Sequence, residues 1–214
     1  MDETERTRTA PPSSPREITR RLGNSFALMR SIIRWSAGGA ASVENYAWHL
    51  EGRFDAISRV LMAVLRDPGM RFDLGGMITE ELLDQRLSDG FHAISAEGPP
   101  VPVGAAAAEV LALLLHELVT NSVEHGALGL AEGGELRLRW RIEDTGAGGP
   151  AVCLDWIERG APAVLTREGF GSMVLNEMLP YQLDASVARR FGPDGVHIAL
   201  TLPMRTLAPS DGAG

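Results

Sequence analysis

The amino-acid sequence predicts an α+β protein, with a helical hairpin followed by a sandwich of one sheet and one layer of helices. Three features carry this prediction. Two apolar stripes with helical period lie near the N-terminus, one long apolar helix lies in the middle, and alternating strand-like segments follow it. Helices and antiparallel strands in this mixture are typical of a sheet with helices packed on one side.

The N-terminal hairpin is predicted over residues 15–69. Its first helix starts at Ser14-Pro15, with Ser14 as N-cap, and ends at Gly38-Gly39. Ser42 caps the second helix, which ends near Asp67-Pro68-Gly69. Each helix has a narrow apolar stripe of coiled-coil type, formed by Ile18, Leu22, Phe26, Met29 and Ile33 in the first and by Tyr46, Leu50, Ile57, Leu61 and Val64 in the second.

A hairpin of two helices cannot bury both of these stripes by itself, so it needs a surface to pack on. We expect a homodimer through residues 15–69, in which two hairpins form a four-helix bundle. The alternative is that the hairpin packs on the rest of its own chain.

The following residues, 70–205, have the pattern of a second unit. Its longest helix begins after the turn Gly98-Pro99-Pro100 and stops at Gly126, in the position of a C-cap glycine. A last strand hairpin turns at Gly192-Pro193-Asp194-Gly195. The other expected elements are a short helix at Met77–Leu87, strands at Phe91–Glu97, Glu135–Ile142 and Ala151–Ile157, a turn into a helix at Gly169–Pro180, and hairpin strands at Gln182–Phe191 and Val196–Leu202.

Composition and charge limit the classes of function. The 214 residues, of which 44% are hydrophobic, suit one domain of ordinary size or two small ones. The net charge of −8 argues against a general nucleic-acid binder and against binding to an anionic membrane. The single cysteine, Cys153, excludes an intrachain disulfide and fits a reducing compartment. We expect a cytoplasmic protein with disordered tails at residues 1–14 and 206–214, no secretory signal and no membrane span.

The middle helix carries a polar stripe that is unusual for a core helix. Glu117, Asn121 and His125 are spaced at i, i+4 and i+8, so they lie along one face of the helix. Burying a carboxylate and a carboxamide without partners is unfavourable. The stripe therefore faces either solvent or a cleft.

Three short motifs have the chemistry to line such a cleft. Asn121 has a side-chain oxygen suited to Mg²⁺, and Glu117, one turn earlier, can orient or deprotonate an attacking group or hold a metal-bound water. At the end of a strand, the Glu158 carboxylate can accept a hydrogen bond from an adenine amino group, and Trp156 points to the same face. Gly169-Phe170-Gly171 opens a helix, where backbone N–H groups and the helix dipole favour phosphate.

In this order and spacing, the motifs LHELVTNSVEHGAL, WIERGAP and GFGSMVLNEML resemble those of the HWE-type sensor histidine kinases. The letters that name this family fall on His116, Trp156 and Glu158. The resemblance covers residues 15–203 and implies a Bergerat-type ATP-binding fold, shared with gyrase and Hsp90-like proteins, over residues 70–205.

The resemblance also implies the cofactors ATP and Mg²⁺ and roles for single residues. Glu117 and His116 would act on the catalytic side, Asn121 would bind Mg²⁺, and Glu158 would bind adenine. The residues expected around the nucleotide are Trp156, Gly160, Gly169 and Gly171. For His116 a bond to a neighbouring loop, and for Trp156 a place in the core beneath the sheet, are the alternatives.

The sequence departs from the family at the phosphoacceptor. The family pattern resembles His-Arg-Val-Lys-Asn, whereas the first helix of this chain has Arg20-Arg21-Leu22-Gly23-Asn24 at the corresponding positions. No histidine lies on the first helix, and the Arg20 guanidinium stays protonated and is no nucleophile. Glu124 replaces a lysine near the expected phosphates, and Leu61 replaces a frequent histidine of the second helix.

The sequence therefore predicts a degenerate, regulatory member of the family without an attached sensor domain. We expect it to bind a response regulator receiver domain or a partner kinase through the hairpin, and it can retain ATP. Two alternatives remain open. One is an active histidine kinase with a non-standard acceptor such as His49; the other is a non-catalytic binding module, phosphotransfer-like or anti-sigma-type, on the same fold. A phosphotransfer role needs an acceptor histidine, and an anti-sigma role leaves the hairpin unexplained.

Overall fold

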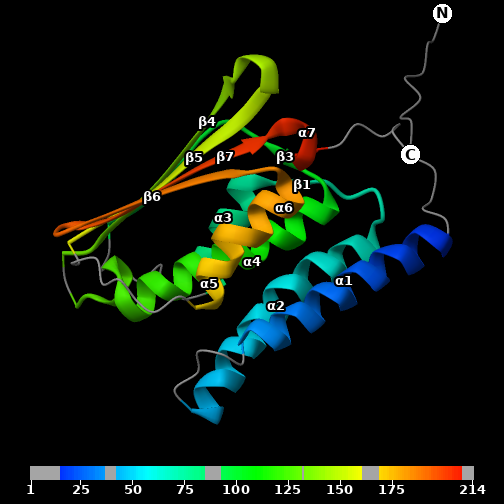
Figure 1. Cartoon of the computed structure of the whole chain (residues 1–214), viewed down its shortest axis with the longest axis horizontal. Helices are drawn as coiled ribbons and strands as arrows, with labels where there is room; N and C mark the ends of the chain where they lie inside the picture. The colour runs from blue at the N-terminus through cyan, green and yellow to red at the C-terminus, as the bar shows by residue number, and fades with distance from the viewer. Residues whose placement is uncertain (1–14, 37–41, 85–92, 132, 161–168, 209–214) are drawn as a thin grey trace, which may run out of the picture.

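The computed structural model describes residues 15–36, 42–84, 93–131, 133–160 and 169–208. A sheet forms one layer, a group of helices packs against one of its faces, and a helical hairpin lies beyond those helices (Figure 1). The predicted α+β class, with sheet and helices on opposite sides, is therefore confirmed.

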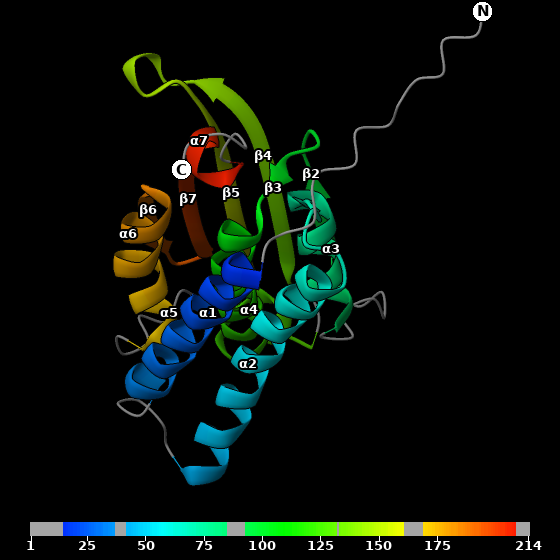
Figure 2. The same cartoon turned by 90° about the vertical axis from the view of Figure 1, so that its right-hand side faces the viewer.

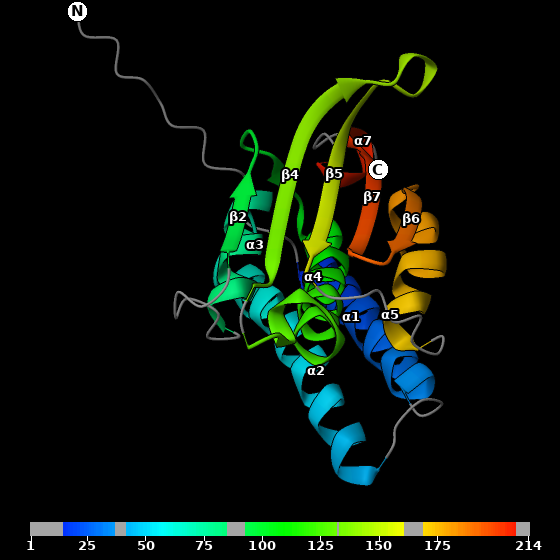
Figure 3. The same ribbon diagram turned by 90° about the vertical axis from the view of Figure 1, so that its left-hand side faces the viewer.

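The main sheet has the strand order β2-β4-β5-β7-β6, which Figure 3 shows. β2 runs parallel to β4, and the other neighbouring strands are antiparallel. The side chains of Leu138, Trp156 and Ile198 share one row across the sheet and all point into the core. The strand bounds are β2 Ala93–Glu97, β4 Glu135–Asp144, β5 Pro150–Arg159, β6 Ser186–Gly192 and β7 Gly195–Pro203.

The helices that cover this sheet are centred on α4, which spans Ala105–His125. Around it lie α3 Leu74–Asp84, α5 Phe170–Met173, the π-helical segment η3 Val174–Met178, α6 Leu179–Leu183 and α7 Met204–Leu207. Short 3₁₀ turns are η1 Ala127–Gly129 and η2 Gly146–Gly148. Two brief strands, β1 Phe72–Asp73 and β3 Pro102–Val103, pair beside the start of α3. The sequence pattern did not predict this strand pair.

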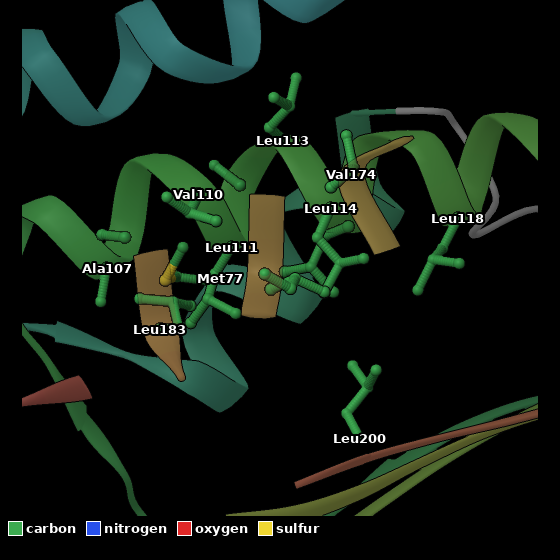
Figure 4. Close-up of a cluster of buried hydrophobic side chains, with 14 of the residues drawn as sticks. Met77, Ala107, Val110, Leu111, Leu113, Leu114, Leu118, Val174, Leu183 and Leu200 are labelled. Atoms are coloured by element: carbon green, nitrogen blue, oxygen red, sulfur yellow. The ribbon is translucent and has the colours of Figure 1, made fainter. Parts of the chain in front are cut away.

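α4 is buried on two sides, which explains its composition. Leu111, Leu114 and Leu118 lie on the side nearer the sheet, and Leu200 of β7 lies opposite them (Figure 4). Leu113 points the other way, toward the hairpin, and is also fully buried. By length and hydropathy α4 could cross a membrane, but 78% of its most apolar window is buried inside the protein. It is therefore a core helix that is hydrophobic almost all round.

The hairpin consists of α1 (Pro15–Ser36) and α2 (Val43–Arg66), and it packs on α4 of its own chain (Figure 2). This is the alternative to the homodimer that the sequence left open, and it follows from the second apolar side of α4. α2 turns toward α4 a buried row that consists of Arg53, Ala56, Ile57, Val60 and Val64.

The side of α1 that faces inward differs from the apolar stripe predicted from the sequence. Leu28 and Ile32 are buried, together with Ser25 and Ser36. In contrast, Phe26 is 61% and Ile33 is 45% exposed. The members Leu22 and Met29 are partly buried, and the side chain of Ile18 lies outside the described part. Of the four stripe residues whose side chains are described, Phe26 and Ile33 are therefore left uncovered by the chain itself.

Several predicted boundaries differ from the observed ones. Ser42 does cap α2, accepting a hydrogen bond from the Asn45 N–H at 3.1 Å, whereas Ser14 lies outside the described residues. The strand predicted from Gln182 begins only at Ser186, because α6 continues to Leu183. At the C-terminal end, α7 buries Leu207 completely, so ordered structure continues past the expected boundary at residue 205.

The other face of the sheet is covered by no helix within the described part of the chain (Figure 1). It carries ion pairs instead: Asp155 accepts from Arg141 at 3.0 Å and lies 2.7 Å from His197 Nε2. The Cys153 thiol donates to Glu143 Oε2 at 3.4 Å. Partial burial raises the pKa of this thiol, and the neighbouring Glu143 carboxylate raises the pKa further.

Candidate functional site

Glu117, the first residue of the polar stripe of α4, faces the hairpin. The Glu117 side chain is buried, with 6% of the residue exposed. Arg53 of α2 donates to both of its oxygens, from Nε to Oε1 at 2.7 Å and from Nη2 to Oε2 at 3.1 Å. Two parallel charge-assisted bonds of this kind are among the stronger polar contacts in proteins. The predicted catalytic-side acid therefore has a cationic partner that the sequence did not reveal.

Arg53 also connects Glu117 to two further elements. Its Nη1 donates to Ser36 Oγ at the end of α1 at 2.7 Å. Its guanidinium carbon lies 4.1 Å from the centre of the Phe170 ring, within the range of a cation–π contact. Because Phe170 belongs to the Gly169-Phe170-Gly171 motif, one buried arginine links both hairpin helices to two of the predicted motifs.

Asn121 and Gly171 lie side by side. A Cβ atom on Gly171 would be 3.0 Å from Asn121 Nδ2 and 3.4 Å from Glu117 Oε2, so the backbone passes close to both side chains. Asn121 is exposed and makes no hydrogen bond through its side chain within the described residues. Gly169, two residues earlier, is the N-cap of α5. The Asn-containing motif and the glycine motif thus meet at one place.

His116 points to a different neighbourhood. Its Nδ1 lies 2.9 Å from Glu81 Oε1 of α3, and Arg59 of α2 donates to the other Glu81 oxygen at 2.5 Å. A Cβ on Gly52 would lie only 2.6 Å from His116 Nε2, so α2 packs against the imidazole ring at this residue. His116 therefore connects α4 with α2 and α3. The alternative considered from the sequence was a bond to a neighbouring loop; the observed partners are helices instead.

Glu158 and Trp156 lie on one face of β5, as predicted, and they bond to each other. The indole Nε1 of Trp156 donates to Glu158 Oε1 at 2.7 Å. The other oxygen accepts from Ser122 Oγ at 2.8 Å and from the Ala127 N–H at 2.9 Å. Trp156 is fully buried, so in this structure its ring is part of the core. Glu158 has three donors, all from its own unit, and holds the end of α4 against β5.

This contact also explains the glycine at the end of α4. Gly126 has φ −114°, which is not the left-handed conformation of a common C-cap glycine. A Cβ there would lie 2.0 Å from Glu158 Oε2, so the glycine is needed for close approach. Gly160, at the far end of β5, does have a positive φ of 93°, and its backbone lies against the carbonyl of Gly133. Ala161 and Pro162 lie outside the described residues.

The positions that depart from the family lie at the hairpin. Glu124 points toward α2, where its Oε1 lies 3.3 Å from His49 Nε2. Its other oxygen is 3.7 Å from His125 Nε2. Arg20 is exposed on α1, and Leu61 is half-buried on α2. The one histidine considered as a substitute acceptor, His49, therefore lies against Glu124 of α4.

The residues fit Mg²⁺ and ATP in part. Mg²⁺ is usually held by one or two protein ligands, while phosphates and waters complete its shell, so Asn121 alone can serve. No group of three His, Cys, Asp or Glu side chains able to hold a metal by itself occurs in the described residues. The open Asn121 beside the Gly171 backbone fits such a shared ion, whereas Glu117 and Glu158 already have partners.

Arg53 and Glu81 are the residues of this site that sequence reasoning missed. A signal for Arg53 was present. The predicted stripe of α2 passes from Leu50 to Ile57, seven residues on, and leaves out the position between them that a coiled-coil spacing requires. Arg53 fills that place on the buried side of α2. A charged residue at a stripe position indicates a buried partner, although the partner itself cannot be read from the pattern.

Known proteins with similar sequences point to one family. Residues 17–100 match the model of the family described as HWE histidine kinase. The blue-light-activated histidine kinase of Rhizobium johnstonii is 31% identical over 191 residues, which cover 87% of this chain and 52% of that protein. The blue-light-activated histidine kinase of Brucella anthropi is 32% identical over 191 residues, covering 88% of this chain and 38% of that protein. The chain thus spans about half or less of the length of these curated relatives.

A solved structure has the same fold. The histidine kinase domain of the Erythrobacter litoralis blue-light-activated histidine kinase superposes with a TM-score of 0.62, covering 88% of this chain and 90% of that domain. The sequences are 16% identical, so this likeness speaks for the fold alone. This likeness in fold agrees with the architecture described above, a helical hairpin joined to an α/β sandwich.

Proposed function

Because this chain belongs to the HWE histidine kinase family, we propose that it is a regulatory histidine-kinase-like protein of two-component signalling that binds ATP together with Mg²⁺. Histidine kinases in general use these two cofactors. The single observation that carries the proposal is the approach of Gly171 to Asn121 and Glu117, because it brings together a glycine turn and a carboxamide that has no hydrogen-bond partner among the described residues.

In this proposal, the unit of residues 70–205 holds the nucleotide. Asn121 offers its side-chain oxygen to Mg²⁺, and the backbone at Gly169 and Gly171 faces the phosphates. Glu158 keeps acceptor capacity beyond its three hydrogen bonds, since a carboxylate can accept about four, and can reach an adenine amino group. Bound Mg²⁺ and ATP supply a transferable phosphoryl group; the chain's own residues hold and orient it.

The regulatory part of the proposal rests on the acceptor position. Arg20 cannot take a phosphoryl group, because its guanidinium remains protonated. Glu124 adds a negative charge near the proposed phosphate position. We therefore propose that the protein acts by binding a receiver domain or a partner kinase in the cytoplasm, with the hairpin of residues 15–69 as the docking element.

A homodimer through the same hairpin is also proposed. Its support is the stripe on α1, where Phe26 and Ile33 are largely exposed although the other side of α1 packs inward. Four-helix bundles bury such stripes between two hairpins. Light scattering on the wild type and on Phe26→Glu tests this: we expect a dimer that the substitution converts to a monomer, and a monomeric wild type would exclude it.

A second candidate function is an active kinase that uses His49. The observation that favours it is the 3.3 Å approach of His49 Nε2 to Glu124 Oε1, since a carboxylate can accept a proton from an imidazole that is being phosphorylated. Incubation with labelled ATP decides between the two. Acid-labile label that disappears in His49→Gln supports this candidate, and absence of label supports the regulatory one.

The nucleotide part is tested by titrating ATP with and without Mg²⁺. We expect binding at millimolar concentration or below, and Asn121→Ala should weaken the Mg²⁺-dependent part by about tenfold or more, or about 1.4 kcal/mol. Asn176→Ala is the matched control, because Asn176 is likewise an exposed asparagine on a helical segment and lies five residues beyond Gly171. If the wild type binds no ATP at millimolar concentration, the proposal of a nucleotide site is wrong.

A further inference from the structure

Arg53 and Glu117 belong to different parts of the chain, yet they form a closed, buried pair. Both residues are almost completely buried, and 64 positions separate them in sequence. We propose that this pair is a latch: the docked hairpin occupies Glu117, and Mg²⁺–ATP gains use of this acid only when Arg53 leaves it. The inference rests on the proposed function, because it concerns the regulation of the same site.

Charge is the first argument for a latch. The Glu117 carboxylate lies out of water, so it needs a cation, and Arg53 supplies that cation through both oxygens. Asn121, the proposed Mg²⁺ ligand, lies one turn further along the same face of α4. A metal ion there would be a second cation for the same carboxylate. Two cations that compete for one acid make hairpin docking and nucleotide binding mutually unfavourable, and such coupling is reciprocal.

The second argument is that α2 contacts acids on both sides of Asn121. Arg53 pairs with Glu117, and His49, one turn earlier on α2, lies 3.3 Å from Glu124. These two acids stand four residues before and three residues after Asn121. The N-terminal half of α2 therefore brackets the proposed metal position, while Asn121 itself stays exposed to solvent.

The third argument concerns which part of α2 can move. From Ala56 to Val64 the side facing α4 is apolar and buried, and separating it would expose that surface to water. At His49 and Arg53 the contacts are polar, so water and a bound cation can replace them. Gly52 lies against the His116 ring without any side chain of its own. Leu50 and Phe54 in this segment are only partly buried against the core, so the polar end of α2 can leave α4 while the apolar end stays packed.

The first test compares Mg²⁺–ATP binding by the wild type, Arg53→Gln and a matched control, Arg59→Gln. Arg59 is also an α2 arginine with acidic partners, but those partners are Glu81 and Asp84 on α3. We expect Arg53→Gln to bind Mg²⁺–ATP at least about fivefold more tightly than the wild type, because about fivefold is the lower end of common coupling between two sites. The affinity of Arg59→Gln for Mg²⁺–ATP should equal that of the wild type. Binding that is equal or weaker in Arg53→Gln, with a wild type that binds, would overturn the latch.

The second test uses the wild type alone, which removes any dependence on folding of the variant. Backbone amide exchange is measured over α2 with and without Mg²⁺–ATP. The latch predicts faster exchange at residues 49–54 on addition of the nucleotide, and little change at residues 60–66. Unchanged or slower exchange at 49–54 in the presence of bound nucleotide contradicts it. If neither the wild type nor Arg53→Gln binds Mg²⁺–ATP, the nucleotide site itself is absent, and both proposals fall.

Discussion

Glu117 and Glu158 are two carboxylates with the same burial and different partners. Their exposed fractions are 6% and 7%, and the family resemblance predicts a place at the nucleotide site for both. Among the described residues, Glu117 is held by one arginine, which comes from the hairpin. Glu158 is held by a hydroxyl, a backbone N–H and an indole, all neutral and all within the unit that contains the sheet.

This difference separates a contact that can be exchanged from one that is permanent. The Arg53–Glu117 pair crosses an interface between two packed elements, so a movement of the N-terminal end of α2 breaks it while the rest of α2 stays packed. The donors of Glu158 sit on β5 itself, on the end of α4 and on η1, so they are lost only when that part of the core opens. Equal burial therefore does not imply an equal role in regulation. Four substitutions test this comparison, beginning with the largest expected effect.

Arg53→Met should destabilise the protein most. It leaves Glu117 as a buried charge without a partner, which typically costs about 3–5 kcal/mol. The double variant Arg53→Met/Glu117→Met should recover most of that loss, since apolar residues can replace a buried ion pair at little cost. Urea unfolding followed by circular dichroism measures both free energies. A loss below about 1 kcal/mol for the single variant would show that Glu117 is compensated in another way.

Glu158→Gln should cost somewhat less, about 1–3 kcal/mol. The substitution replaces one carboxylate oxygen, an acceptor, by an NH₂ group, a donor. This group would then face another donor, either the Trp156 indole N–H or the Ser122 hydroxyl and the Ala127 N–H. Urea unfolding and the fluorescence of Trp156 report the change. Glu177→Gln, an exposed position on η3, is the control and should have little effect. If Glu158→Gln were neutral, the three hydrogen bonds would not be needed for the fold.

Gly52→Ala tests the close contact between α2 and His116. The added methyl group would meet His116 Nε2 at 2.6 Å, and Glu81 holds the ring in place, so we expect a loss of about 1–2 kcal/mol from overpacking. Gly23→Ala is the matched control: Gly23 lies on α1 with nothing within 4 Å, and alanine there should stabilise the helix by about 0.5–1 kcal/mol. Thermal unfolding of the two variants should therefore shift in opposite directions, and a shift in the same direction would refute this contact.

His49→Gln should have the smallest effect on stability, below about 1 kcal/mol. The His49–Glu124 pair is partly exposed, with side-chain exposures of 20% and 28%, so water and salt compete with it. Unfolding measured at low and at high salt should show that the small loss shrinks as salt increases. A loss as large as that of Arg53→Met would mean that this pair, too, is a buried anchor.

Local features of the protein were readable from the sequence. Ser42 predicts the start of α2, and the alternation of Leu136, Leu138 and Trp140 predicts the buried face of β4. The meeting of Asn121 with Gly171 followed from motif order and family resemblance. The predictions for α2 and β4 hold because caps and periodicity depend on residues a few positions apart. The pairing of β1 with β3 and the inward face of α1 depend on distant residues and were not predicted.

The sequence by itself determined which residues are polar on α4 and which elements carry the motifs around them. Only the tertiary structure decided what those polar groups touch. Glu117 faces Arg53 across 64 positions of sequence, and Glu158 faces Ser122 across 36. A carboxylate can accept bonds from an arginine, a hydroxyl or a ligand with similar geometry, so its residue type leaves the partner open. The partner is decided by which helix packs there, and α2 packs there because α4 has an apolar side left to cover.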